Sequence, residues 1–61
     1  MFIASICWSD HTVNHYYFHK EENAINCCDN FKFAFGNQVE LTYVMYRIPD
    51  YKNQNDFKFE D

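Results

Sequence analysis

In the middle of the chain the spacing of apolar residues changes at Gly36, and this change limits what the chain can fold into. Before Gly36, apolar side chains recur at the three- and four-residue intervals of one helix face. They are Ala24, Cys27, Cys28, Phe31 and Phe35. After Gly36, residues 39–48 follow the two-residue period of a strand. The stretch from Glu21 to Ile48 therefore predicts a helix, from about residue 20 to 35, that leads into a long strand. We expect Gly36, the only glycine, to close the helix in the left-handed conformation.

Two further strands are expected before the helix, at residues 2–8 and 13–18, where alternating, β-branched and aromatic side chains dominate. Residues 9–12 are turn-forming and too few for anything but an antiparallel hairpin. The prediction is a small α+β domain of ββαβ order over residues 1–49, a three-stranded antiparallel sheet with one helix on one face. Pro49 ends the last strand, and residues 50–61 form a polar tail that could add a short edge strand.

An all-β meander is the alternative fold. Residues 31–35 also alternate with period two, and Gly36 with Asn37 could turn a hairpin into the next strand. The helix is favoured because its apolar stripe is the longer pattern. Glu21 and Glu22 also fall in its first turn, where the helix dipole favours acidic residues.

The chain has more rings than so small a sheet can bury. Seven Phe, five Tyr and one Trp make it 21% aromatic, and one helix covers only one face of a sheet. The other face would carry Tyr16, Phe18 and Tyr46, or their neighbours, because a slip of one residue exchanges the faces. Since Tyr, Trp and Arg dominate binding hot spots, we expect a protein-binding surface there. Its candidate residues are Trp8, Tyr16, Phe18, Tyr43, Tyr46, Arg47 and Tyr51.

Charge and cysteine content argue against several classes of protein. A formal net charge of -4 disfavours direct binding of nucleic acid. Three cysteines without a CxxC pair suggest free thiols in a reducing cytoplasm, and neither a disulfide framework nor a zinc site. No basic leader and no apolar segment of spanning length is seen, so neither export nor membrane insertion is expected.

No set of residues predicts catalysis, a metal or a cofactor. His11, His15 and His19 recur every four residues, but on a strand neighbours would lie about 13 Å apart, too far for shared metal bonds of about 2 Å. Ser9, Asp10 and His11 adjoin in a predicted exposed turn, whereas a catalytic triad converges from distant parts of a fold. We therefore expect a protein that is not an enzyme.

The chain is similar in format to the small inhibitor proteins that phages produce against their hosts. The likeness lies in its single acidic domain without a catalytic motif and in the run Val39–Tyr46, which suits a sheet interface. It implies stoichiometric binding to a bacterial defence protein in the host cytoplasm. We expect a homodimer, formed across the uncovered sheet face or the last strand. The alternatives are a sponge for a nucleotide signal, with rings and Arg47 around the ligand, and a structural assembly subunit.

Overall fold

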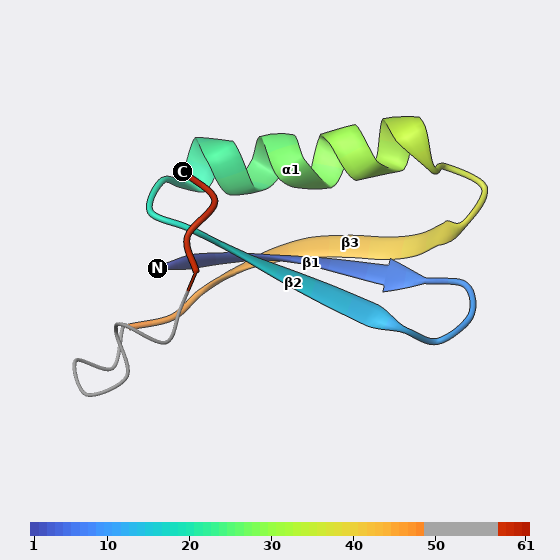
Figure 1. The fold of residues 1–61 in the computed structure, drawn as a ribbon, viewed down its shortest axis with the longest axis horizontal. Helices are drawn as coiled ribbons and strands as arrows, with labels where there is room; N and C mark the ends of the chain where they lie inside the picture. Colours follow the sequence, from blue (N-terminus) through green and yellow to red (C-terminus); the bar gives the residue numbers. More distant parts are fainter. Residues whose placement is uncertain (49–57) are drawn as a thin grey trace.

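The computed structural model describes residues 1–48 and 58–61. Its elements follow in the order β1 (Phe2–Trp8), β2 (Val13–Phe18), α1 (Glu21–Ala34) and β3 (Val39–Tyr46). The strands form one antiparallel sheet in the order β2-β1-β3, and α1 lies over one face of it (Figure 1). The predicted α+β fold of ββαβ order is therefore confirmed. The all-β meander is wrong, because the helix continues through Phe31 to Ala34.

A tight turn joins β1 to β2. The backbone N–H of Trp8 donates to the carbonyl oxygen of Thr12 at 2.9 Å, and that of His11 donates to Trp8 at 3.0 Å. His11 has a φ of 74°, a left-handed conformation that short turns between twisted strands require. The Asp10 carboxylate accepts the backbone N–H and the hydroxyl of Thr12, and so holds the turn. The turn lies where the sequence predicts it.

The central strand β1 sets the register of both neighbours. Phe2 lies opposite Phe18 on one side and Tyr46 on the other. The terminal amino group of Met1 donates to the carbonyl oxygen of Arg47 at 3.0 Å, and the N–H of Arg47 returns a bond of 2.8 Å. β3 ends at Tyr46, two residues before the predicted end at Ile48.

The helix ends where a side chain would not fit. Phe35 follows its last residue, and the backbone N–H of Phe35 donates to the carbonyl oxygen of Phe31 at 2.9 Å. The expected left-handed conformation of Gly36 is wrong, because its φ is not positive. Glycine is needed there for space, since a Cβ would lie 2.9 Å from the carbonyl oxygen of Lys32.

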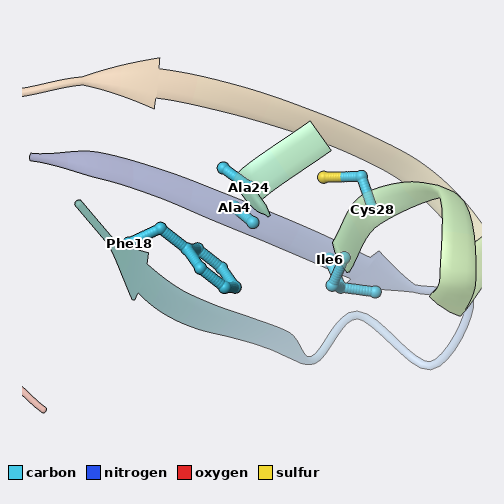
Figure 2. Packing of buried hydrophobic residues seen from close by; sticks show 5 residues of the cluster. All are labelled: Ala4, Ile6, Phe18, Ala24 and Cys28. Carbon is cyan, nitrogen blue, oxygen red and sulfur yellow. The ribbon is translucent and has the colours of Figure 1, made fainter. Parts of the chain in front are cut away.

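The core lies between α1 and the even-numbered residues of β1. Ala4 and Ile6 of the sheet, Phe18 of β2, and Ala24 and Cys28 of the helix form it (Figure 2). Ala4 and Ala24 are both fully buried, and their small side chains let the helix backbone approach the sheet closely. The predicted helix stripe is thus the face that packs on the sheet.

The C-terminal residues return to the sheet beside β2. Phe59 forms a single parallel bridge with Tyr17, and the backbone N–H of Glu60 donates to the carbonyl oxygen of Tyr17 at 2.9 Å. The predicted domain boundary at Pro49 and the tail residues 50–57 lie outside the residues that the structure describes.

Candidate protein-binding face

The face of the sheet opposite α1 carries three cross-strand rows of side chains. We call this surface the open face. Its rows are Val13–Cys7–Leu41, His15–Ser5–Tyr43 and Tyr17–Ile3–Met45, each running from β2 across β1 to β3. These positions alternate with the residues that pack under α1. Among residues 1–48 and 58–61, no helix or strand covers the open face (Figure 1).

Exposed apolar side chains lie on both outer strands of the open face. Val13 is 46% exposed, Leu41 55%, Tyr43 39% and Met45 45%. On the middle strand, by contrast, Ile3 is only 5% exposed. The exposed apolar side chains thus lie on the outer strands of one uncovered face, and clustered exposed apolar side chains usually mark an interaction site.

A buried polar pair lies in the middle row of the open face. Ser5 is fully buried, and its hydroxyl lies 2.8 Å from Nδ1 of His15 on the adjacent strand. A buried hydroxyl needs such a partner, because losing its water without replacement costs about 1–3 kcal/mol. The serine oxygen is sealed from solvent and therefore is not presented to a substrate. His15 is exposed and offers the open face a polar contact among apolar neighbours.

Three of the residues predicted to bind a partner lie under the helix instead. Phe18 is part of the core, with 7% of its surface exposed. The rings of Trp8 and Tyr16 pack on Phe31 of α1, at centroid distances of 5.9 and 5.3 Å. The sequence left open which face the helix covers, and the structure puts these even-numbered positions on the covered side. These three rings attach the helix to the sheet.

The other predicted residues are spread over separate surfaces. Tyr43 alone lies on the open face. Tyr46 is on the helix side at the end of β3, 64% exposed, with its ring 5.0 Å from that of Phe2. Arg47 is exposed just beyond it, and Tyr51 lies outside the described residues.

Most residues of the open face were not predicted from the sequence. Val13, Leu41, Met45 and the pair Ser5–His15 were not among its candidates. The two-residue alternation of Leu41, Tyr43 and Met45 is visible in the sequence, but it says only that the three share a face. The predicted set was chosen for aromatic side chains, and three of its rings, those of Trp8, Tyr16 and Phe18, lie under the helix.

The residues with titratable or metal-binding side chains are dispersed. His11 lies in the β1–β2 turn, His15 on the open face, and His19 before α1, with its ring stacked 3.8 Å from that of Phe59. In the part of the chain that the structure describes, no three His, Cys, Asp or Glu residues group as a metal site would require. Burial raises the pKa of the Cys27 and Cys28 thiols, which makes both less nucleophilic.

Two surface hollows of about 400 and 440 Å³ lie away from the open face. The first lies between α1 and the C-terminal residues and includes the carboxylates of Glu60 and Asp61. The second surrounds the β1–β2 turn and includes Asp10. Among the residues that the structure describes, no lysine or arginine lines either hollow. Their charge does not suit a phosphate-bearing ligand.

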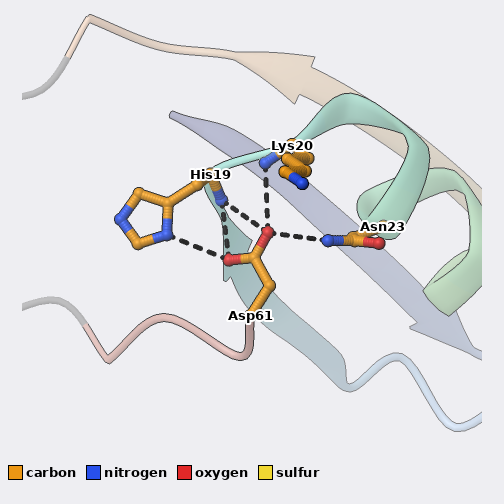
Figure 3. Close-up of polar contacts among 4 residues, drawn as sticks. All are labelled: His19, Lys20, Asn23 and Asp61. Atoms are coloured by element: carbon orange, nitrogen blue, oxygen red, sulfur yellow. Dashed lines mark hydrogen bonds and ion pairs between the residues drawn. The ribbon is translucent and has the colours of Figure 1, made fainter.

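The side chain of Asp61 binds the segment that leads into α1. The residue before the helix, Lys20, makes no side-chain capping bond. The Asp61 carboxylate instead accepts the backbone N–H groups of His19 and Lys20 at 2.9 and 3.1 Å, and the amide of Asn23 at 2.9 Å (Figure 3). These hydrogen bonds, that of Asn23 above all, hold the pKa of Asp61 well below its ordinary value. The C-terminal residues thus stabilise the start of the helix.

No helix in the described part of the chain has the length and apolar character needed to cross a membrane. No protein-family model, curated protein or solved structure matches this chain. The open face is therefore the feature from which a function is inferred.

Proposed function

We propose that this protein acts by binding another protein through the open face of its sheet, and that it inhibits that protein by occupying its surface. The observation that supports the proposal is a set of exposed apolar side chains on one uncovered face. Val13 of β2 and Leu41, Tyr43 and Met45 of β3 are all at least 39% exposed. Each of these side chains would contribute about 1 kcal/mol if a partner buried its remaining surface. The exposed His15 supplies a polar contact that favours a complementary partner.

A bacterial defence protein is the class of target that we propose. The reason is the similarity in format to small phage inhibitors, which bind in stoichiometric amounts. Sheet surfaces of this kind suit such binding, because a rigid surface loses little conformational entropy on association.

A sponge for a nucleotide signal is less favoured by the charges. Among the described residues, the open face carries no lysine or arginine, and both hollows contain a carboxylate. Arg47 is exposed but lies beyond the end of β3, on neither hollow. A nucleotide needs cationic or N–H groups around its phosphates, so protein binding is the better-supported proposal.

Affinity capture with matched variants tests this proposal. The tagged chain is used to recover a partner from lysates of candidate bacterial hosts, beside Val13→Lys, Met45→Lys and Phe33→Lys chains. Phe33 is 95% exposed on the helix and controls for the added charge. We expect the chain and the Phe33→Lys variant to recover the same protein, and the two open-face variants to lose at least tenfold of it. Circular dichroism verifies that each variant is folded.

Two results would count against the proposal. If no lysate yields a protein in stoichiometric amount, the binding function is wrong. If Phe33→Lys abolishes capture while Val13→Lys and Met45→Lys leave it intact, the partner binds the helix and not the open face.

A further inference from the structure

The outer edge of β3 is the second unusual feature of the sheet. The hydrogen bonds around β1 show which backbone groups face this edge. Met1 and Arg47 exchange both of their bonds, and the N–H of Ser9 donates to Gln38, so odd-numbered residues of β1 bond toward β3. The N–H of Trp8 donates to Thr12, so even-numbered residues bond toward β2. The two directions alternate, as an antiparallel ladder requires.

The register then identifies the outward-facing groups of β3. Ser5 lies opposite Tyr43 and is odd-numbered, so the backbone N–H and C=O of Tyr43 point inward to β1. The backbone groups of Thr42, Val44 and Tyr46 therefore point out of the sheet. Among residues 1–48 and 58–61, no strand pairs with them.

Most of this edge lacks the features that keep edge strands from pairing with other strands. Proline, lysine and a covering helix or loop are common on such edges, and the eight residues Val39–Tyr46 contain neither proline nor lysine. The one charged residue, Glu40, lies near the strand's start, beside the register shift at Cys7 and Trp8. The edge of β2 differs, because the C-terminal tail bonds to Tyr17 there. The unpaired N–H and C=O groups of β3 can therefore form hydrogen bonds with a strand of another chain.

We propose that a second copy of this chain pairs antiparallel along β3, with the two-fold axis passing between the two Tyr43 residues. Thr42 of each copy then lies opposite Val44 of the other, and both residues present outward N–H and C=O groups. The two sheets join into one continuous sheet, with both copies of α1 on the same side.

Side chains pair favourably in this register. On the open face Leu41 lies opposite Met45 of the second copy, and on the helix side Thr42 lies opposite Val44, so apolar groups meet on both faces. A slip of one residue would bring open-face positions against helix-side positions. Glu40 lies opposite Tyr46 and Arg47 opposite Val39, so the charged residues fall toward the ends of the paired strands and not at the axis.

The dimer would double the open face without interrupting it. The rows of one copy continue into those of the other across the paired β3 strands, and this larger face would meet the partner protein. That last step rests on the proposed function, whereas the dimer itself does not.

Light scattering of the chain, and of two variants with opposite charges at Tyr43, tests the dimer. At micromolar concentration we expect twice the chain mass of 7.5 kDa. The Tyr43→Lys and Tyr43→Glu chains should each be monomeric, because each places like charges across the axis. Mixing these two chains should restore a dimer that contains one of each. Phe33→Lys, which carries an added charge far from β3, should remain a dimer.

A cross-link keeps the test valid if a charged variant fails to fold. The Cα atoms of a pair that is not hydrogen-bonded lie about 4.5 Å apart in an antiparallel sheet, within disulfide range. Tyr43→Cys should therefore oxidise to a covalent dimer, whereas Phe33→Cys and the unaltered chain should not.

A monomeric mass for the unaltered chain would overturn the proposal, as would a mixture of the two charged chains that stays monomeric or a Tyr43→Cys chain that does not cross-link. The failure of this proposal and that of the proposed function remain distinguishable. Val13→Lys lies on β2, so it should abolish partner capture while leaving the dimer mass unchanged.

Discussion

The carboxylate of Asp61 lies 2.9 Å from the backbone nitrogen of His19, although 42 residues separate the two in sequence. The first N–H groups of a helix have no partner within the helix and need a cap. A nearby Ser, Thr, Asp or Asn usually provides it, but Lys20 occupies that position here and makes no side-chain cap bond. The Asp61 carboxylate binds the backbone N–H groups of Lys20 and of the residue before it, so it ties the tail to the junction of β2 and α1.

Asp61→Ala should lower the melting temperature by about 5 °C, the effect expected for the loss of about 1 kcal/mol in a domain of this size. The reason is that the N–H groups of His19 and Lys20 lose their acceptor. Glu60→Ala is the matched control, because it removes the same charge one residue away. Thermal unfolding followed by circular dichroism measures both variants. Equal effects of the two substitutions would show that charge, and not these hydrogen bonds, is responsible.

Stability should depend on pH through Asp61. The amide of Asn23 and the backbone N–H of His19 hold the pKa of Asp61 below its ordinary value of 3.8. A depressed pKa means that the native state favours the charged form, so the contribution is complete above pH 3.8 and is lost as pH falls further. We expect the gap in melting temperature between the chain and its Asp61→Asn variant to narrow from pH 6 to pH 2.5.

The comparison between those two chains isolates Asp61 from Asp10. The pKa of Asp10 is also lowered, mainly by the hydroxyl of Thr12, so Asp10 loses its contribution over the same pH range in both chains. A gap that stays constant down to pH 2.5 would contradict the role of the Asp61 charge.

Period and turn chemistry in the sequence were enough to predict the elements. The helix Glu21–Ala34 falls within the predicted residues 20–35, and β1 and β2 have the predicted bounds. These signals are local, because a helix or a strand repeats its pattern over a few residues. The hydrogen bonds of Asp61 with His19 and Lys20 are not local, and no pattern near Lys20 indicates them.

The face of the sheet was beyond what the sequence could decide. On β1, Ile3 and Cys7 are as apolar as Ala4 and Ile6, so alternation alone does not say which side meets the helix. The decision depends on close packing of Ala4 against α1, a property of the assembled fold. The polar Ser5 suggests an exposed position, yet it is fully buried on the open face beside His15. Of the residues on the open face, only Tyr43 was therefore predicted from the sequence.

Ile6→Ala should be severely destabilising. Ile6 is one of the largest fully buried side chains. Truncating such a side chain to alanine typically costs about 2–5 kcal/mol. A domain of this size has only about 3–5 kcal/mol of stability in total, so the variant should be largely unfolded at 37 °C. Phe33→Ala, at a position 95% exposed, should change the free energy of unfolding by less than about 0.5 kcal/mol. Urea unfolding monitored by Trp8 fluorescence compares the two, and a cooperative, near-normal transition for Ile6→Ala would contradict this account of the core.

Gly36→Ala sets two opposed effects against each other. Alanine restricts the unfolded chain and would by itself stabilise the fold by about 0.4–1 kcal/mol. Its Cβ, however, would lie 2.9 Å from the carbonyl oxygen of Lys32, a backbone atom in the last helical turn that cannot rotate away. Relieving that clash must distort the turn between α1 and β3, where Gln38 and Val39 both donate to Phe35. We expect the clash to prevail and to cost about 1 kcal/mol net, seen as a lower urea midpoint with an unchanged slope. Asn37→Ala, at the exposed neighbouring residue, is the control, and an equal or higher midpoint for Gly36→Ala would show that the chain can make room for the methyl group.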